Sequence, residues 1–319
     1  MSNKIVVGID IGGTNTKFGL VDENGIVLIQ DKVNTATFKK VEDFTHVLTA
    51  SILQLVLTQK DMELVGVGIG SPNGNYYTGT VEFAPNLPWK GVIHLSKLFH
   101  EAFKLPVALT NDAKAAAMGE MRFGGAKNMK DFLFITLGTG LGSGIVSNGA
   151  LVYGHDGFAG EMGHTIIKED SNRLCGCGRY GCLETYTSAT GIRKSYMKFL
   201  AEKDKRAAID PKKIDSAYIF QLAREGDEEA LQAFKYTGHI LGLALANAVT
   251  YFSPQAIFLF GGLAQSGELI FKPTRESFEK NLLKVYQGKV KILHSSLHDG
   301  DAAILGAASL IWNELSLVS

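Results

Sequence analysis

Apolar positions in the first third of the chain fall into short runs that alternate with stretches of helical spacing. The pattern predicts an amphipathic helix over 41–58, apolar strands at 64–69 and 107–109, and an alanine-rich helix over 113–121. Strands that alternate with helices are typical of a mainly parallel or mixed sheet whose faces are covered. We therefore expect the first part of the chain to form an α/β unit.

A second series of elements starts near residue 132. The elements predicted there are helices at 189–202 and about 216–252, a strand at 256–260, and a last helix after Asp299-Gly300-Asp301. A charged stretch at 203–213 contains Pro211 and predicts a surface loop. Small residues would permit close packing of the last helix: Ala302, Ala303, Gly306, Ala307 and Ala308.

One pattern occurs twice, about 130 residues apart. Each copy, at 5–21 and 132–146, consists of an apolar strand, a turn of glycine and threonine, and a second strand. Glycines at such a turn bring backbone N–H groups close to an anion, and Thr14 and Thr139 add hydroxyl donors at matching places. The duplication predicts two hairpins that hold the phosphates of a nucleotide from both sides.

Two common nucleotide-binding motifs do not fit these hairpins. The sequence has no P-loop string, and the glycines of the second hairpin lack the spacing of a dinucleotide-binding turn. A third glycine turn, Gly261-Gly262, follows the predicted strand at 256–260. Ligands of open α/β sheets bind at such carboxyl ends of strands.

The composition of the chain indicates which classes of binding partner to expect. The 319 residues are 45% hydrophobic and 20% charged, with a formal net charge of zero. Nothing in this balance favours nucleic acid or an anionic membrane. The longest apolar stretch, around 240–252, is interrupted by polar residues and is too short to span a bilayer. A strand that begins by Ile5 leaves no room for a signal peptide, so we expect a cytoplasmic protein of about two domains.

All three cysteines lie within eight residues, as Cys175, Cys177 and Cys182, with His164 upstream. An odd number packed so tightly is a poor disulfide framework. Three thiolates and one imidazole would complete a tetrahedral zinc shell without an open position, so the site would be structural. The alternative is three free thiols and an unrelated histidine.

Acidic and amide residues mark a candidate catalytic site. Asn111-Asp112 lies where a strand ends and a helix begins, so either residue could simply cap that helix. A carboxylate there could instead accept a proton from a substrate hydroxyl. Glu161 and Glu184 flank the cysteine segment, and carboxylates that accept hydroxyl hydrogen bonds suit a polyol. Taken together, these residues favour a sugar site over unrelated surface charges.

Four stretches give the chain a resemblance to the ROK family of sugar kinases, in the actin/hexokinase-like ATPase superfamily, over essentially its whole length. They are Asp10-Ile-Gly-Gly-Thr14 with Lys17 and Gly19, Asn111-Asp112-Ala113, Glu161-Met-Gly-His164, and Cys175-Gly-Cys-Gly-Arg-Tyr-Gly-Cys-Leu-Glu184. The resemblance implies an α/β, two-domain actin/hexokinase-like (ribonuclease H-like) fold with a duplicated β-hairpin phosphate-binding core and an interdomain cleft. The small domain would be 1–122, joined by the C-terminal helix 301–319, and the large domain, 123–300, would carry the zinc loop.

The same resemblance implies residue roles in a kinase that uses Mg-ATP. Asp112 would be the general base for the attacking hydroxyl, Asp10 would lie near Mg²⁺, and His164 would ligate zinc while its other ring nitrogen faces the sugar. The sugar-binding residues would be Asn86, Asn111, Asp112, Glu161, His164 and Glu184. The nucleotide-binding residues would be Asp10, Gly12, Gly13, Thr14, Lys17, Gly138, Thr139, Gly140, Gly261 and Gly262.

The segment Leu183-Glu184-Thr185 with Ser188-Ala-Thr-Gly191 resembles glucokinases more than N-acetylhexosamine kinases. We therefore expect phosphorylation of glucose at its 6-hydroxyl, as in glycolysis. Kinases for N-acetylglucosamine, N-acetylmannosamine, mannose or fructose, or a kinase that uses polyphosphate, are the competing enzymatic functions. Two functions without turnover also compete: a sugar-binding protein and a transcriptional repressor. A repressor would carry a DNA-binding unit before the first hairpin, and the position of that hairpin leaves no room for one. Dimers are common in the family that the chain resembles, so we expect a homodimer.

Overall fold

The computed structural model describes residues 3–203, 213–298 and 300–318. It divides into two compact units: the first comprises 1–129, 151–160 and 296–319, and the second comprises 130–150 and 161–295. The surface loop expected at 203–213 lies mostly outside the described residues. The domain boundaries expected from the sequence remain a prediction.

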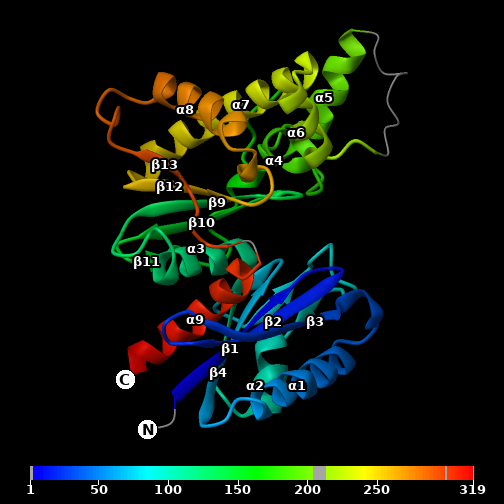
Figure 1. Cartoon of the computed structure of the whole chain (residues 1–319), viewed down its shortest axis with the longest axis vertical. Coiled ribbons are helices and arrows are strands. Elements are labelled where there is room, and N and C mark those ends of the chain that lie inside the picture. The colour runs from blue at the N-terminus through cyan, green and yellow to red at the C-terminus, as the bar shows by residue number, and fades with distance from the viewer. Residues whose placement is uncertain (1–2, 204–212, 299, 319) are drawn as a thin grey trace. The chain divides into compact units, whose positions relative to one another are not determined.

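A five-stranded sheet forms the centre of the first unit (Figure 1). Its strands are β1 (Asn3–Ile11), β2 (Asn15–Asp22), β3 (Val27–Asn34), β4 (Met62–Ser71) and β8 (Val107–Asn111), in the order β3-β2-β1-β4-β8. The β1–β2 and β2–β3 pairs are antiparallel, whereas β1–β4 and β4–β8 are parallel. The mixed sheet expected from the sequence is confirmed.

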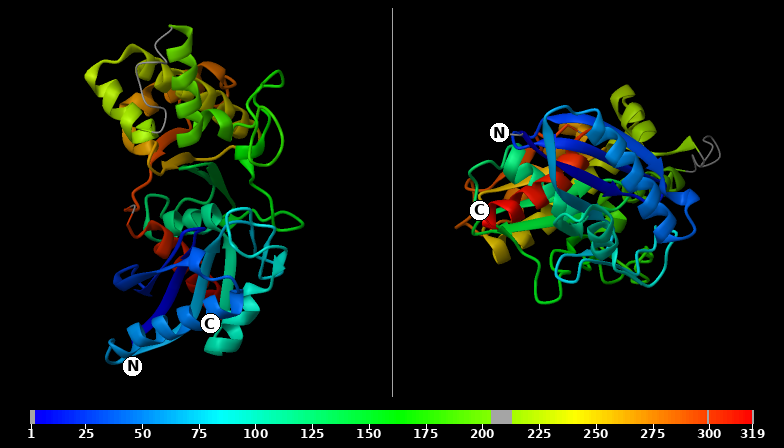
Figure 2. Two further views of the ribbon diagram at one scale, coloured as in Figure 1. Left: turned by 90° about the vertical axis from the view of Figure 1, so that its right-hand side faces the viewer. Right: turned by 90° about the horizontal axis from the view of Figure 1, so that it is seen from below.

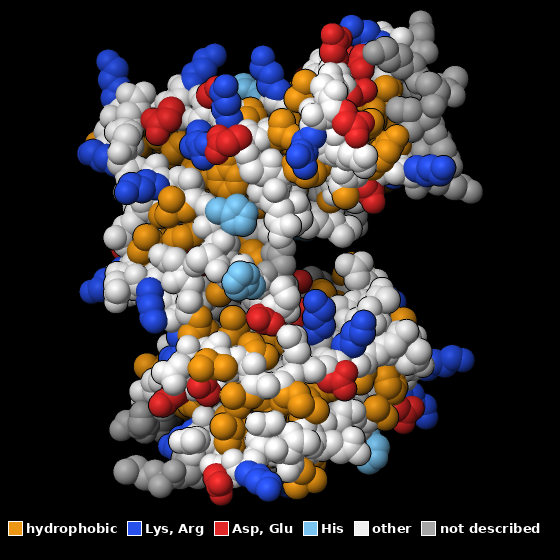
Figure 3. Space-filling view, viewed as in Figure 1, with side chains coloured by type: hydrophobic (Ala, Val, Ile, Leu, Met, Phe, Trp, Pro, Cys, Tyr) orange, Lys and Arg blue, Asp and Glu red, His pale blue; other side chains and the backbone are white. Residues whose placement is uncertain are grey.

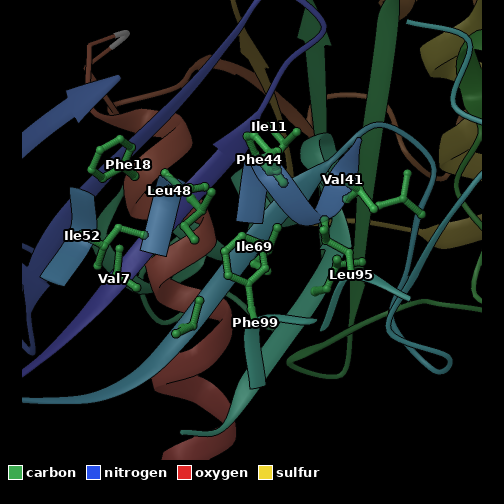
Figure 4. Close-up of a cluster of buried hydrophobic side chains, with 14 of the residues drawn as sticks. Val7, Ile11, Phe18, Val41, Phe44, Leu48, Ile52, Ile69, Leu95 and Phe99 are labelled. Atoms are coloured by element: carbon green, nitrogen blue, oxygen red, sulfur yellow. The ribbon is translucent and has the colours of Figure 1, made fainter. Parts of the chain in front are cut away.

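Helices α1 (Val41–Leu57) and α2 (Leu95–Phe103) contribute to the hydrophobic core on one face of this sheet (Figure 4). Apolar side chains at helical spacing in α1 pack with strand residues that alternate between the two faces. The buried cluster includes Val7, Phe18, Phe44, Leu48, Ile52, Ile69 and Phe99. The predicted helix over 41–58 is therefore confirmed within one residue, and its apolar stripe is what attaches it to the sheet.

Helices α3 (Asp112–Phe123) and α9 (Ala302–Val318) pack against each other in the first unit. Helix α9 lies directly on β1 and β4, because a Cβ on Gly8 would be 2.1 Å from the Ile304 carbonyl oxygen. A Cβ on Gly68 would be 1.9 Å from the Ala307 carbonyl oxygen. Glycine is therefore required at both strand positions, and the close packing predicted for the last helix is confirmed.

The sheet of the second unit repeats the order of the first. Its strands are β9 (Phe132–Leu137), β10 (Leu141–Ser147), β11 (Ala150–Leu151), β12 (Ala256–Phe260) and β13 (Lys291–His294), in the order β11-β10-β9-β12-β13. An antiparallel hairpin, β9–β10, is again followed by parallel neighbours. The duplication detected in the two hairpins thus extends to whole five-stranded sheets.

Helices α5–α8 of the second unit gather on one side of its sheet (Figure 2). The helices of this unit are α4 (Glu184–Thr187), α5 (Ala189–Glu202), α6 (Ser216–Glu225), α7 (Glu228–Phe252) and α8 (Glu268–Asn281). Helices α7 and α8 approach closely because α7 contains glycine at the contact: a Cβ on Gly242 would be 2.3 Å from the Thr274 carbonyl oxygen. The predicted helix at 189–202 is confirmed as α5. The helical segment predicted at about 216–252 consists of two helices, α6 and α7.

Several elements have no counterpart in the sequence-based prediction. They include α2, α8, β3 and β13, and a small sheet of β5 (Gly74–Asn75), β6 (Thr80–Glu82) and β7 (Val92–Ile93). Strands of two or three residues are too short to show an alternating pattern. Helix α8 contains Pro273, which normally indicates a helix boundary. Local sequence signals were therefore weak or misleading in these segments.

Positively and negatively charged side chains are interspersed on both units on the face shown in Figure 3. This distribution agrees with the formal net charge of zero. Among the described residues, the helices include none long and apolar enough to cross a membrane.

Candidate active site and metal centre

The first glycine turn connects β1 and β2 and is built around a close backbone contact. The Gly12 N–H donates to the Asn15 carbonyl oxygen at 3.0 Å, which tightens the turn. A Cβ on Gly13 would lie 2.3 Å from the carbonyl oxygen of Asn86. The loop that carries Asn86 therefore lies directly on this turn, although the two are far apart in the sequence.

Replacing Gly13 by alanine should displace either the turn or the Asn86 loop, because backbone atoms occupy the space. We expect a loss of about 1–3 kcal/mol in the free energy of unfolding, the usual cost of overpacking. The kcat/KM of any reaction at this turn should fall as well. Thermal denaturation and kinetics would measure both effects. Gly300→Ala is the matched control, since a Cβ there meets nothing within 4 Å; equal behaviour of the two variants would contradict the prediction.

Asp112 begins helix α3 at the end of strand β8. The Asn111 side chain caps the helix, accepting hydrogen bonds from the N–H groups of Ala113 at 3.0 Å and Lys114 at 3.3 Å. One Asp112 oxygen accepts from the Ala113 N–H at 2.7 Å. The cap role considered for Asn111 is thus observed, and it leaves the Asp112 side chain exposed to solvent.

Asp10 and Asp112 influence each other electrostatically within the first unit. The pKa of Asp10 is raised to about 6, chiefly by burial and also by the negative charge of Asp112, while Lys17 on the paired strand lowers it. Desolvation by the surrounding protein also raises the pKa of the Asp112 carboxyl, whereas hydrogen bonds from Ala113 and Asn111 lower it. Because the Asp112 side chain is itself exposed, we infer that its pKa rises less than it would in a completely buried carboxyl. A divalent cation beside Asp10 would relieve this like-charge repulsion.

The second glycine turn, at 138–140, is held from two sides within the second unit. The Gly138 and Thr139 carbonyl oxygens accept from the Ala189 N–H at 2.8 Å and the Thr190 hydroxyl at 3.0 Å. On the other side, Glu184 Oε2 accepts from the Leu141 N–H at 3.0 Å. A Cβ on Gly140 would lie 2.2 Å from that same oxygen, so a side chain at this position would displace the Glu184 carboxylate.

The third glycine turn lies beside the second. Gly261 has φ +96°, and a Cβ on it would lie 2.9 Å from the Leu137 carbonyl oxygen at the end of β9. The Leu263 N–H donates to the same oxygen at 3.2 Å. Both turns therefore lie at the carboxyl ends of neighbouring parallel strands, β9 and β12, where ligands of such sheets bind.

The metal-ligating side chains of the cysteine segment converge. One ligand atom from each of His164, Cys175, Cys177 and Cys182 lies within 4.8 Å of all the others. The Cys175 sulfur is 3.6 Å from His164 Nδ1, and the Cys177 and Cys182 sulfurs are 3.7 Å apart. Ligands of a tetrahedral zinc ion would be about 3.6 Å apart for sulfur and nitrogen and about 3.8 Å for two sulfurs. The donor set and its spacing fit zinc.

The proposed sugar-binding acids differ in their surroundings. Glu161 is exposed and precedes a short 3₁₀ helix, η2 (Met162–His164), which packs on β10. A Cβ on Gly163 would lie 2.2 Å from the Leu141 carbonyl oxygen, which explains the glycine in this motif. Glu184 is half-buried, and besides its bond to Leu141 its Oε1 is 3.3 Å from the Cys175 sulfur. Glu184 therefore connects the cysteine segment to the second glycine turn.

The predicted site residues form two groups, one in each unit. Asp10, the first turn, Asn86, Asn111 and Asp112 belong to the first unit. The second and third turns, Glu161, Glu184 and the four metal-ligating residues belong to the second. Within each unit the predicted residues lie close together in the folded chain, as the contacts above show.

Arg173 is a residue of this site that the sequence analysis did not identify. Its guanidinium lies 4.4 Å from the centroid of the Tyr186 ring and donates to the Thr185 carbonyl oxygen at 2.8 Å and to Ser195 Oγ at 3.0 Å. It thereby attaches the cysteine segment to helices α4 and α5. An arginine two residues before the first cysteine was the only available signal, and arginine is common on protein surfaces.

Comparison with protein families matches residues 6–314 to the ROK family, and the chain therefore belongs to this family. A glucokinase from Thermotoga maritima is 35% identical over 312 residues, which cover 96% of each protein. A xylose repressor from Caldicellulosiruptor bescii is 30% identical over 97% of this chain and 78% of its own length.

Among solved structures, a ROK family glucokinase from Streptomyces griseus in complex with glucose and AMPPNP matches with a TM-score of 0.80. It is 34% identical, and the match covers 96% of this chain and 98% of that protein. The family resemblance and the actin/hexokinase-like α/β fold expected from the sequence are thus confirmed.

Proposed function

We propose that this protein is an ATP-dependent hexose kinase that phosphorylates glucose at its 6-hydroxyl. The observation that carries the proposal is Asp112: an exposed carboxylate with a raised pKa, fixed at the start of a helix and electrostatically coupled to Asp10 beside the first glycine turn. The glucokinase relatives of 34–35% identity support glucose as the substrate.

In the proposed reaction Asp112 accepts the proton of the attacking hydroxyl as the oxygen approaches the transferred phosphate. A base is most effective when its pKa is close to the working pH, which a raised carboxyl pKa favours. Asn86, Asn111, Glu161, His164 and Glu184 would bind the other sugar hydroxyls. Phosphoryl transfer requires mainly positioning and stabilisation of charge, so no covalent intermediate with the protein is needed.

The nucleotide would be held by the glycine turns. Gly12, Gly13 and Thr14, with Lys17, would approach the transferred phosphate, and Gly138, Thr139 and Gly140 the other phosphates. Gly261 and Gly262 would lie beside adenosine. Asp10 would hold Mg²⁺, whose chemistry is to neutralise phosphate charge, while zinc in the Cys₃His site would be structural. We also propose a cytoplasmic homodimer in carbohydrate metabolism.

The rate of phosphorylation should depend on pH through these two carboxyl groups. Asp112 must be ionised to act as a base, so kcat/KM should rise with pH through its raised pKa and then level off. Protonation of Asp10 near pH 6 should add to the acid-side loss by weakening cation binding. Protonation of Asp112 alone should cause about a tenfold loss per pH unit below its pKa, and protonation of Asp10 should make the loss steeper. Constant kcat/KM from neutral pH down to the ordinary carboxyl pKa of 3.8 would argue against Asp112 as the base.

A coupled ADP-release assay over a sugar panel tests the substrate. The panel contains glucose, mannose, fructose, N-acetylglucosamine and N-acetylmannosamine, each with Mg-ATP and separately with polyphosphate. We expect turnover on glucose with ATP. Turnover on an N-acetyl sugar would retain the mechanism and replace the substrate, and turnover with polyphosphate alone would replace the donor. No turnover on any sugar would favour a sugar-binding protein or a regulator.

A further inference from the structure

Lys114 in helix α3 is a buried charge that the proposed reaction does not use. Its side chain is 1% exposed, and lysine is almost never fully buried unless its ammonium group has partners. Its Nζ donates to the Gly157 carbonyl oxygen at 2.7 Å and lies 5.9 Å from the centroid of the Tyr153 ring. Gly157 and Tyr153 both belong to residues 151–160, which we name the strap.

The strap belongs to the first unit, although the residues on either side of it, 130–150 and 161–295, belong to the second. Two further contacts hold it there. The Asn75 side-chain amide donates to the Asp156 carbonyl oxygen at 2.8 Å. The Tyr153 and Tyr76 rings stack with their centroids 4.2 Å apart. The strap is thus attached to the first unit through Tyr153, Asp156 and Gly157.

The strap has an unusual backbone conformation at the residue that the lysine contacts. Gly157 has φ +90°, a conformation that other residues rarely adopt, and a Cβ on it would lie 2.5 Å from Asn75 Oδ1. This conformation accompanies the hydrogen bond from the buried ammonium to the Gly157 carbonyl. A charge-assisted hydrogen bond in a site closed to water is stronger than one at the surface.

The strap directly precedes one proposed sugar-binding residue in the sequence, and its lysine partner lies close in sequence to another. Lys114 is two residues after Asp112 in the same helix, and the strap ends at Gly160, immediately before Glu161. We propose that Lys114 is a positioning residue: by holding the Gly157 carbonyl, its ammonium fixes the strap from which the chain continues into Glu161. This inference rests on the proposed function, because Glu161 is a sugar ligand only there.

The test compares Lys114→Met with the wild-type protein in two measurements. Hydrogen exchange of backbone amides 153–160 reports on the strap itself, and calorimetry gives the Kd for glucose and for a non-hydrolysable ATP analogue. We expect about tenfold faster exchange in the strap and about a tenfold higher Kd for glucose, the scale of one charge-assisted hydrogen bond. The Kd for the nucleotide should change less than about twofold.

A second variant disturbs the same contact from the strap side. Gly157→Ala should raise the glucose Kd similarly, and combining it with Lys114→Met should add little, since both remove one interaction. Gly288→Ala is the matched control, because Gly288 also has a positive φ, +69°, but a Cβ there meets nothing within 4 Å. Its glucose Kd should stay at the wild-type value.

The possible failures are distinguishable. Unchanged strap exchange and glucose Kd in Lys114→Met would overturn the positioning role. A lower thermal midpoint with an unchanged glucose Kd would also overturn it, because the lysine would then only stabilise the fold. If the wild-type protein bound no hexose, the proposed function would fail and the role toward Glu161 with it, while strap exchange would still show whether Lys114 anchors the strap.

Discussion

Asp112→Asn is expected to lower kcat for sugar phosphorylation by about 10²–10⁴-fold, the usual contribution of a general base. The amide has nearly the same shape as the carboxyl, and its oxygen can still accept from the Ala113 N–H, so the fold should be retained. The KM values for sugar and ATP should change much less than kcat, because the variant loses the proton acceptor and keeps the binding groups. Steady-state kinetics over both substrates would measure this separation.

Asp227→Asn provides a matched control for this experiment. Asp227 also lies at the start of a helix, where its side chain accepts from the Ala230 N–H at 2.7 Å, but it has no part in the proposed site. Its substitution tests what the same chemical change does to helix capping alone. If Asp112→Asn retained a kcat within a few fold of this control, Asp112 would not be the base.

Removal of zinc should have the second large effect. A structural zinc ion contributes on the order of 10 kcal/mol in small zinc-dependent folds, and here it would hold the segment from His164 to Cys182 together. We expect a chelator, or Cys182→Ser, to lower the thermal midpoint and to abolish hexose binding. Differential scanning calorimetry and titration calorimetry would measure the two effects, and elemental analysis should find about one zinc per chain.

The same experiment has a reversible control. Zinc returned to the chelated wild-type protein should restore both the thermal midpoint and hexose binding, whereas Cys182→Ser should recover neither, because one ligand is missing. Because Glu184 joins the cysteine segment to the second glycine turn, loss of zinc should also weaken nucleotide binding. A metal-free protein with wild-type stability and hexose affinity would show that the cysteines do not form a structural centre.

The sequence predicted best where one short segment determines the structure. The helix at 189–202 has clear apolar spacing and matches α5 at both ends. The strand at 256–260 is followed by two glycines and matches β12. The cysteines of the metal centre are close in sequence, so their spacing alone predicted a shared ion. In each of these segments, local preference and tertiary packing favour the same structure.

Contacts between distant segments could not be predicted in this way. The approach of Asn86 to Gly13, and of Glu184 to Gly140, depends on how loops pack on the sheets, and no local pattern encodes it. The same holds for Lys114 and the strap, where the lysine looked like one polar residue in an alanine-rich helix. A glycine in the sequence can indicate that another segment packs closely against that position. The sequence alone does not show which segment it is.

The position of helix α9 on Gly8 and Gly68 has a consequence for synthesis of the protein. The strands that it covers are among the first residues to leave the ribosome, but the helix itself is made only when the chain reaches 302–318. Until then the face of β1 and β4 under α9 lacks its cover, whereas the residues of the second unit, up to 295, have already been made. We therefore expect the second unit to fold first during translation, and chains stalled before α9 to be targets for chaperones and proteases.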